Sequence, residues 1–213
     1  MILGTLIAYK LTISTNVKLK KKMNYIIRLG MVLPYLYMVF LVILFFGQSG
    51  LLSRLLYHLN LISEPSSFPN ILYGRYGFGI IIVYVLKGLP FVVLLVLNIM
   101  SKISGTYNDV AMTLGSSKSQ IFRKIYLPLS RDTIVWSGMV LVAYDLGSFE
   151  VPYIFAHLKH KSFSVMLYSE YLKPSISSIP TTMSMTVILF GISLMTVVGF
   201  ALITRYLIGR FYR

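Results

Sequence analysis

The residues whose types could do chemistry are ionisable side chains that interrupt long apolar runs. Asp145 and Glu150 lie in one such run, five residues apart, so on a helix their directions differ by roughly 140°. Carboxylates that diverge in this way do not form a paired acid and base. Acids inside a membrane span are costly unless each faces water or protein. The spacing therefore argues against an acid/base site and favours either a polar path or a packing role.

Three other ionisable residues, Lys87, His157 and His160, are candidate site residues. Lys87 interrupts a second apolar run beside Gly88 and Pro90, which suggests a local helix break; a functional and a structural role for this lysine are equally compatible with the pattern. His157 and His160 have helical i, i+3 spacing, but no third ligand stands nearby, so no metal site is expected. The chain contains no cysteine, which excludes disulfides and thiol catalysis.

The elements that must position these residues are membrane spans. Of the 213 residues 56% are hydrophobic, and the mean hydropathy is +0.77, which excludes an ordinary soluble domain. We predict an all-α integral membrane protein with a single transmembrane domain over residues 1–213. The opening ten residues are too short to cross a bilayer, and we interpret them as the end of a span whose beginning is missing or as an interfacial helix. Four complete spans are expected at about 29–46, 78–97, 134–155 and 184–204.

Charge gives the orientation of these spans. Fourteen of the twenty Lys and Arg residues lie in 10–28, in 102–131 and at the C-terminus, which fall on one side of the membrane; only five lie in the opposite loops. By the positive-inside rule the richer side is cytoplasmic. The net charge of +14 therefore needs no nucleic-acid partner to explain it, and the C-terminus is expected in the cytoplasm.

Residues 108–128, here called the polar segment, separate the second and third spans. Capping-box spacing at Thr106/Asp109 and again at Ser117/Gln120 predicts two short helices. Gly115 lies between them and permits the left-handed conformation that closes one helix before the next. The second helix has an apolar face, and Pro128 is expected to end it.

The polar segment carries a resemblance to a known family. Asp109-Val110-Ala111, then Gly115, then the ending Ile125-Tyr126-Leu127-Pro128 resembles the EAA loop of permease subunits in binding-protein-dependent ABC importers of type I. Further segments at 48–56, 81–91 and 146–155 look like those of the spermidine/putrescine-type group. Asp in place of Glu at 109 and Val in place of Ala at 110 are small departures. The family usually has six spans, so the resemblance implies that an N-terminal portion is absent here.

The resemblance implies a mechanism and a set of partners. The loop, at about 101–131, would form coupling helices on a cytoplasmic ATPase dimer, with docking contacts from Asp109, Val110, Ala111 and Gly115. Ile125, Leu127 and Pro128 would anchor it to the next span. A second permease, identical or homologous, and an extracytoplasmic solute-binding protein would complete the importer in a prokaryotic plasma membrane. The chain has no GxxxxGK[ST] motif, so the partner ATPase is expected to bind the ATP, and no cofactor is expected in the permease itself.

Two alternatives remain at this point. One is a truncated or degenerate permease without transport activity. The other is an intramembrane enzyme that uses Asp145 with a histidine, although His157 and His160 fall in a loop rather than at the depth of Asp145. In the permease interpretation Asp145 and Glu150 are the candidate residues of the solute path. The identity of the solute cannot be predicted from two carboxylates.

Overall fold

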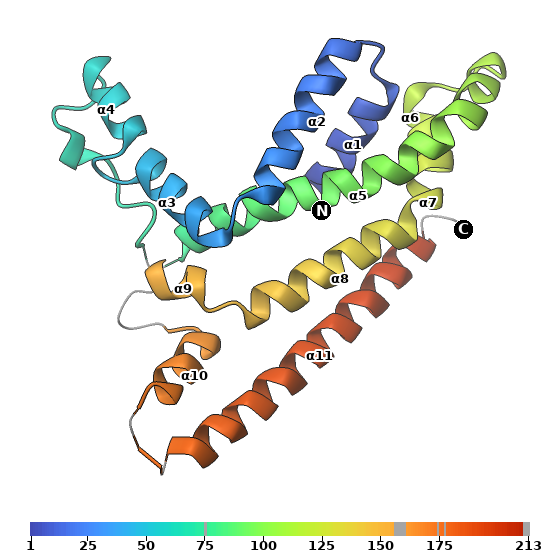
Figure 1. Ribbon diagram of the computed structural model, residues 1–213. Helices are drawn as coiled ribbons and strands as arrows, with labels where there is room; N and C mark the ends of the chain where they lie inside the picture. Colours follow the sequence, from blue (N-terminus) through green and yellow to red (C-terminus); the bar gives the residue numbers. More distant parts are fainter. Residues whose placement is uncertain (75, 156–160, 174, 177, 211–213) are drawn as a thin grey trace. The chain divides into compact units, whose positions relative to one another are not determined.

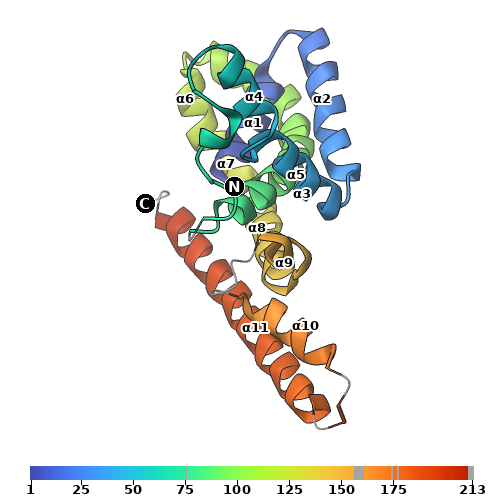
Figure 2. The ribbon, with the colours of Figure 1, turned by 90° about the vertical axis from the view of Figure 1, so that its left-hand side faces the viewer.

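The computed structural model describes residues 1–74, 76–155, 161–173, 175–176 and 178–210. The regular elements of this part are all helical (Figures 1 and 2). His157 and His160 lie outside the described residues. The longer helices are α1 (Ile2–Ile13), α2 (Val17–Val32), α3 (Tyr35–Phe46), α4 (Leu51–His58), α5 (Phe78–Thr113), α8 (Arg131–Gly147), α10 (Phe163–Tyr171) and α11 (Ser178–Arg210). The shorter elements are a 3₁₀ turn at Pro65–Ser67, α6 (Lys118–Ile121), a π-helical turn at Phe122–Tyr126, α7 (Leu127–Leu129) and α9 (Glu150–Phe155).

The chain forms two compact units, each with its own apolar core. The first comprises Met1–Val32, Gly88–Ala143 and Leu194–Arg213, and the second comprises Leu33–Lys87 and Tyr144–Ser193. The core of the first unit is built from α1, α5 and the polar segment, and includes Tyr9, Met100 and Tyr126. The core of the second unit includes Val39, Val83 and Val151.

Within the described residues, three segments are long and apolar enough to cross a membrane: Tyr35–His58, Phe78–Ile103 and Ser178–Thr204. The second and third correspond to predicted spans. The predicted span 29–46 is wrong at its start, because α2 ends at Val32 and a new helix begins at Tyr35. Pro34 explains the shift: it has no N–H for an intrahelical bond and its φ of −60° and ψ of 156° are those of a helix N-cap.

The predicted span 134–155 is also not one continuous helix. Helix α8 ends at Gly147 and α9 begins at Glu150. Pro152 lies in the first turn of α9, where the lack of an N–H costs little. In an unbroken helix, residue 152 would donate to the carbonyl of Ser148, and proline cannot do so. The hydroxyl of Ser164 donates to this carbonyl at 3.0 Å instead. The break therefore has its own hydrogen-bond partner within the second unit.

The sequence also predicts a helix break at Gly88 and Pro90. This prediction is wrong, because α5 continues through both residues. Membrane helices tolerate proline where neighbouring groups compensate for the lost hydrogen bond. Pro90 also has a close packing partner in the first unit. A Cβ added to Gly30 of α2 would lie 3.0 Å from Pro90 Cγ, so the glycine lets α2 approach the proline ring.

Helices α1 and α5 approach each other closely at Gly4. A Cβ at this position would lie 2.8 Å from Val92 Cγ1 and 3.0 Å from Val92 Cβ, and Val92 is buried. Because valine is branched at Cβ, it cannot turn away from an added methyl group as a long side chain can. Gly4 is therefore required by helix contact, in the manner of small residues between membrane helices.

We predict that Gly4→Val destabilises the first unit by about 1–3 kcal/mol, the usual cost of overpacking. The measurement is thermal unfolding of the purified chain in detergent, with a lower midpoint expected for the variant. Gly191→Val is the matched control, because a Cβ at Gly191 meets nothing within 4 Å. Equal midpoints for the two variants would show that α1 is not packed against Val92.

Candidate functional site

The polar segment begins at the C-terminal end of α5, which is closed by a Schellman motif at Gly115. The Gly115 N–H donates to the carbonyl of Met112 at 3.0 Å, and the Ser116 N–H donates to the carbonyl of Ala111 at 3.0 Å. Gly115 has φ of +77°, in the left-handed region that disfavours residues with a Cβ. The predicted glycine turn is thus confirmed, and it reverses the chain between α5 and α6.

Only one of the two predicted capping boxes starts a helix. The Ser117 N–H donates to Gln120 Oε1 at 2.8 Å and the Gln120 N–H donates to Ser117 Oγ at 3.3 Å, at the start of α6. The prediction at residue 106 is wrong, because α5 runs unbroken to Thr113. The first short helix of the sequence prediction is the end of the long α5. A capping-box pattern inside a continuing helix has no free backbone N–H groups to satisfy.

The prediction that Pro128 ends the second helix is also wrong. After α6 the helix widens into the π turn Phe122–Tyr126, in which the Leu127 N–H donates to the carbonyl of Phe122, and α7 then includes Pro128. Proline lacks an N–H and its ring collides with the carbonyl four residues earlier in a regular α-helix. Widening the preceding turn relieves that conflict, so the chain stays helical to Leu129 and enters α8 at Arg131.

Tyr9 of α1 joins the polar segment to the core of the first unit. Its hydroxyl donates to the carbonyl of Lys118 at 2.7 Å. Its ring centroid lies 4.6 Å from that of Phe122 and 5.1 Å from that of Tyr126. Ile121 and Tyr126 are buried in the same cluster, and Ile125 and Leu127 pack against it. The second half of the polar segment is therefore fixed to α1 and α5.

The end of α5 exposes apolar side chains instead. Val110 is 59% exposed, Met112 is 53% exposed and Leu114 is 79% exposed. Ala111 is buried and packs inward, and the side chain of Asp109 lies outside the described part of the structure. These three side chains give the end of α5 an exposed apolar surface.

The second unit contains a separate polar cluster around Lys87. The Lys87 ammonium donates to the carbonyl of Leu33, at the break between α2 and α3, and lies 5.5 Å from the ring centroid of Tyr35. The Tyr35 ring stacks on Tyr144 with centroids 4.7 Å apart. Of the two roles left open for Lys87, these contacts supply a structural one, because the lysine pairs with a carbonyl outside the helical ladder.

The two candidate solute-path carboxylates have different surroundings in this unit. The Tyr84 hydroxyl donates to the main-chain carbonyl of Asp145 at 3.4 Å. The carboxylate Oδ1 of Asp145 is buried and has no hydrogen-bond partner among the described residues. Glu150 is exposed at the first turn of α9, where a negative charge is favoured by the helix dipole. The two carboxylates therefore differ in their surroundings: one has a buried oxygen and the other is exposed.

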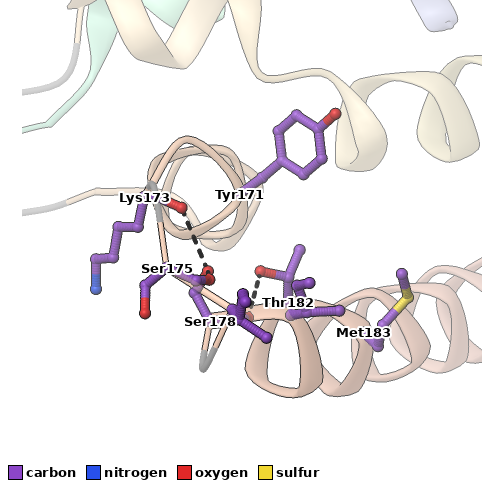
Figure 3. Close-up of a pocket in the computed structure, with 8 residues that line it drawn as sticks. Tyr171, Lys173, Ser175, Ser178, Thr182 and Met183 are labelled. Atoms are coloured by element: carbon purple, nitrogen blue, oxygen red, sulfur yellow. Dashed lines mark hydrogen bonds between the residues drawn. The ribbon is translucent and has the colours of Figure 1, made fainter.

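A hollow of about 300 Å³ lies between the end of α10 and the start of α11 (Figure 3). Its hydroxyl groups take part in local hydrogen bonds: Ser178 Oγ donates to the Ser175 carbonyl at 2.7 Å, and Thr182 Oγ1 donates to the Ser178 carbonyl at 2.9 Å. Lys173 forms an ion pair with Glu170 at 2.5 Å. These bonds stabilise the turn between the helices and do not define a ligand site.

Sequence reasoning missed Tyr9 as a site residue. Tyr9 is separated by 109 residues from the carbonyl that it binds, and no periodic pattern in one sequence reports a contact over that distance. The available signal was the opening apolar stretch with a tyrosine near its basic end, which has the amphipathic form of a residue at a membrane boundary. Its partner could not be inferred from that signal.

These features define a class before they define a family. Several apolar helices, together with a short helix–glycine–helix turn packed against them, are typical of a multi-pass membrane protein. Residues 1–156 match the family described as "Binding-protein-dependent transport system inner membrane component". The chain belongs to this family, and it is a multi-pass protein of the inner membrane.

Individual relatives agree with the family. The chain is 27% identical over 151 residues to the molybdenum transport system permease protein ModB of Azotobacter vinelandii, an alignment that covers 71% of this chain and 62% of ModB. It therefore spans about three fifths of the length of that relative. Its fold resembles a chain in the crystal structure of a bacterial ABC transporter involved in the import of the acidic polysaccharide alginate, with a TM-score of 0.77, 17% identity, and coverage of 96% of this chain and 72% of that one.

A second structure of an alginate ABC transporter, in complex with an alginate pentasaccharide-bound periplasmic protein, gives a TM-score of 0.78 at 16% identity, with coverage of 97% of this chain and 72% of that one. These likenesses establish the fold. The relatives are named for molybdenum and alginate rather than for polyamines, so the narrower grouping with spermidine/putrescine-type permeases stays a prediction.

We predict that Lys87→Met lowers the free energy of unfolding by about 1–3 kcal/mol, because it leaves the Leu33 carbonyl without this donor. Lys87→Arg retains an N–H donor and a positive charge, and is expected to stay within about 0.5 kcal/mol of the parent chain. The measurement is denaturant unfolding of the purified chain in detergent micelles. A Met variant as stable as the Arg variant would assign no structural role to the ammonium group.

Proposed function

We propose that this chain is the permease subunit of a binding-protein-dependent ABC importer and that it forms part of the solute path. Family membership over residues 1–156 supports the proposal most directly. The second support is the polar segment, whose helix–glycine–helix geometry suits a docking element. ATP hydrolysis is then the work of a cytoplasmic ATPase dimer. The chain itself contributes movement, not catalysis.

The coupling surface in this proposal is the exposed tip of α5. Val110, Met112 and Leu114 present apolar area to a cleft on the ATPase, while Gly115 reverses the chain so that α6 does not cover them. Asp109 directly precedes Val110 in the sequence and is part of the proposed coupling surface. The inward packing of Ala111 joins the docked tip to the core, and Ile125, Leu127 and Pro128 connect it to α8. A rigid element in a cleft transmits displacement to the helices on which it is packed.

The remaining partners follow from the proposed class. A second permease, identical or homologous, completes the path, and an extracytoplasmic solute-binding protein delivers the solute. The alginate transporter that shares the fold was solved with its periplasmic protein, which makes a similar arrangement reasonable here. The C-terminus is proposed to lie in the cytoplasm. The solute would be identified from the ligand that co-purifies with the partner binding protein.

We predict that Leu114→Asp weakens binding of the partner ATPase by about ten- to a hundredfold, because burial of a leucine side chain is worth about 1.5–3 kcal/mol. The measurement is a pull-down titration of the ATPase with the full chain in detergent. Val17→Asp is the control, since Val17 is an exposed apolar residue of α2 outside the polar segment. Equal weakening by both variants would remove the tip of α5 from the interface.

The turn itself is tested at Gly115. We expect Gly115→Pro to abolish ATPase binding, because proline cannot take a φ of +77°. Gly115→Asn should retain most of the binding, since asparagine tolerates the left-handed region. Unchanged binding by the proline variant would contradict the docking proposal.

Asp145 and Glu150 remain the proposed solute-path residues, and the absence of native cysteine allows a direct test. We predict that Glu150→Cys reacts with a water-soluble maleimide added from outside and that Asp145→Cys reacts more slowly, because a thiol must ionise in water to react. Val187→Cys is the control on α11, an exposed apolar position inside a candidate span, and it should remain unlabelled. Labelling of Val187→Cys with no labelling of Glu150→Cys would place the path elsewhere.

A further inference from the structure

A groove of about 470 Å³ lies in the first unit between α1 and residues 118–122 of the polar segment. Its walls are mostly apolar and include Leu3, Leu6 and Phe122, and both Lys10 and Lys118 line it. The two helices on either side are held together by the hydrogen bond from Tyr9 to the Lys118 carbonyl. The groove is thus part of a packed unit.

The groove has a direction relative to the bilayer. Helix α1 runs from apolar residues at its start to Lys10 near its end, and the basic helix α2 follows it (Figure 1). Because the basic side is cytoplasmic, Leu3 lies toward the hydrocarbon and Lys10 toward the cytoplasmic surface. Seven residues of helix separate them, a rise of about 10 Å. The groove therefore has an apolar inner part and a basic rim at headgroup level.

We propose that this groove binds an anionic phospholipid of the cytoplasmic leaflet, with one acyl chain against Leu3, Leu6 and Phe122 and the phosphate between Lys10 and Lys118. Both lysines are exposed, and no carboxylate is among the described residues that line the groove. Basic pockets between helices on the cytoplasmic side bind anionic headgroups in this way. Charge complementarity selects the lipid, because a zwitterionic headgroup brings no net charge to the two ammonium groups.

The location gives the lipid a role in the proposed importer. Lys118 begins α6, directly after the turn that would dock on the ATPase. A lipid phosphate at Lys118 would therefore brace the polar segment against α1 from the membrane side, next to the Tyr9 hydrogen bond. Lipid binding itself does not depend on the importer proposal, because it requires only the groove and the membrane.

The test uses a tryptophan reporter in the groove and phospholipids brominated on the acyl chain. The sequence has a single tryptophan, so Trp136→Phe with Phe122→Trp places the only indole in the groove. The full chain is reconstituted in phosphatidylcholine nanodiscs that contain about a tenth brominated lipid, either phosphatidylglycerol or phosphatidylcholine. With about a fivefold preference from each lysine, we expect about 70% quenching by the glycerol lipid and about 10% by the choline lipid.

Charge variants assign the selectivity to the groove. Lys10→Gln with Lys118→Gln should lower quenching by brominated phosphatidylglycerol to about the phosphatidylcholine level. Lys21→Gln with Lys22→Gln removes the same charge from α2 and should leave the preference unchanged. Equal loss in both pairs, equal quenching by the two lipids, or no quenching by either would each overturn the proposal, the last because protein would then cover the groove. If Phe122→Trp does not fold, Leu6→Trp provides the reporter from the opposite wall.

Discussion

Backbone hydrogen bonding inside the bilayer is the constraint on which the structure depends, because hydrocarbon offers no partner to a free N–H or carbonyl. The helices break at Leu33 and Ser148, and each break is matched by a side-chain donor. The Lys87 ammonium donates a hydrogen bond to the Leu33 carbonyl, and the Ser164 hydroxyl donates one to the Ser148 carbonyl. Polar side chains within the apolar sequence therefore have a structural use that is separate from transport.

The polar segment also satisfies the free backbone groups at its helix ends, although it is predicted to lie outside the hydrocarbon. At the C-terminus of α5, N–H groups of the turn at Gly115 donate to the last carbonyls of the helix. At the N-terminus of α6, the side chains of Ser117 and Gln120 accept hydrogen bonds from free N–H groups. At the second end a wider turn accommodates Pro128 without leaving the helix. The segment is thus ordered by its own backbone bonds before any partner binds. A preformed element loses less entropy on docking than a loop that must fold on contact.

Local signals in the sequence were enough for part of this arrangement. Gly115 and Ser117 were predictable because a positive φ and a helix N-cap depend on one or two residues. Pro90 and Pro128 were misjudged because proline disfavours a helix locally while packing against Gly30, or a widened turn, lets it continue. The hydrogen bond from Tyr9 to Lys118 was out of reach, since tertiary folding alone brings those residues together. The inward direction of Ala111 likewise depends on the core it packs in.

The boundaries between the two units, along the sequence, lie at or near positions that favour helix bending. The boundary before Leu33 coincides with the break ahead of Pro34, and the boundary after Ala143 lies a few residues before the break at Ser148. The boundary after Ala143 lies inside α8, and the other two also fall inside continuous helices, next to Gly88 in α5 and close to Gly191 in α11. Breaks, glycine and proline are the usual causes of helix bending. Each boundary therefore lies at or near a position in the sequence that favours helix bending.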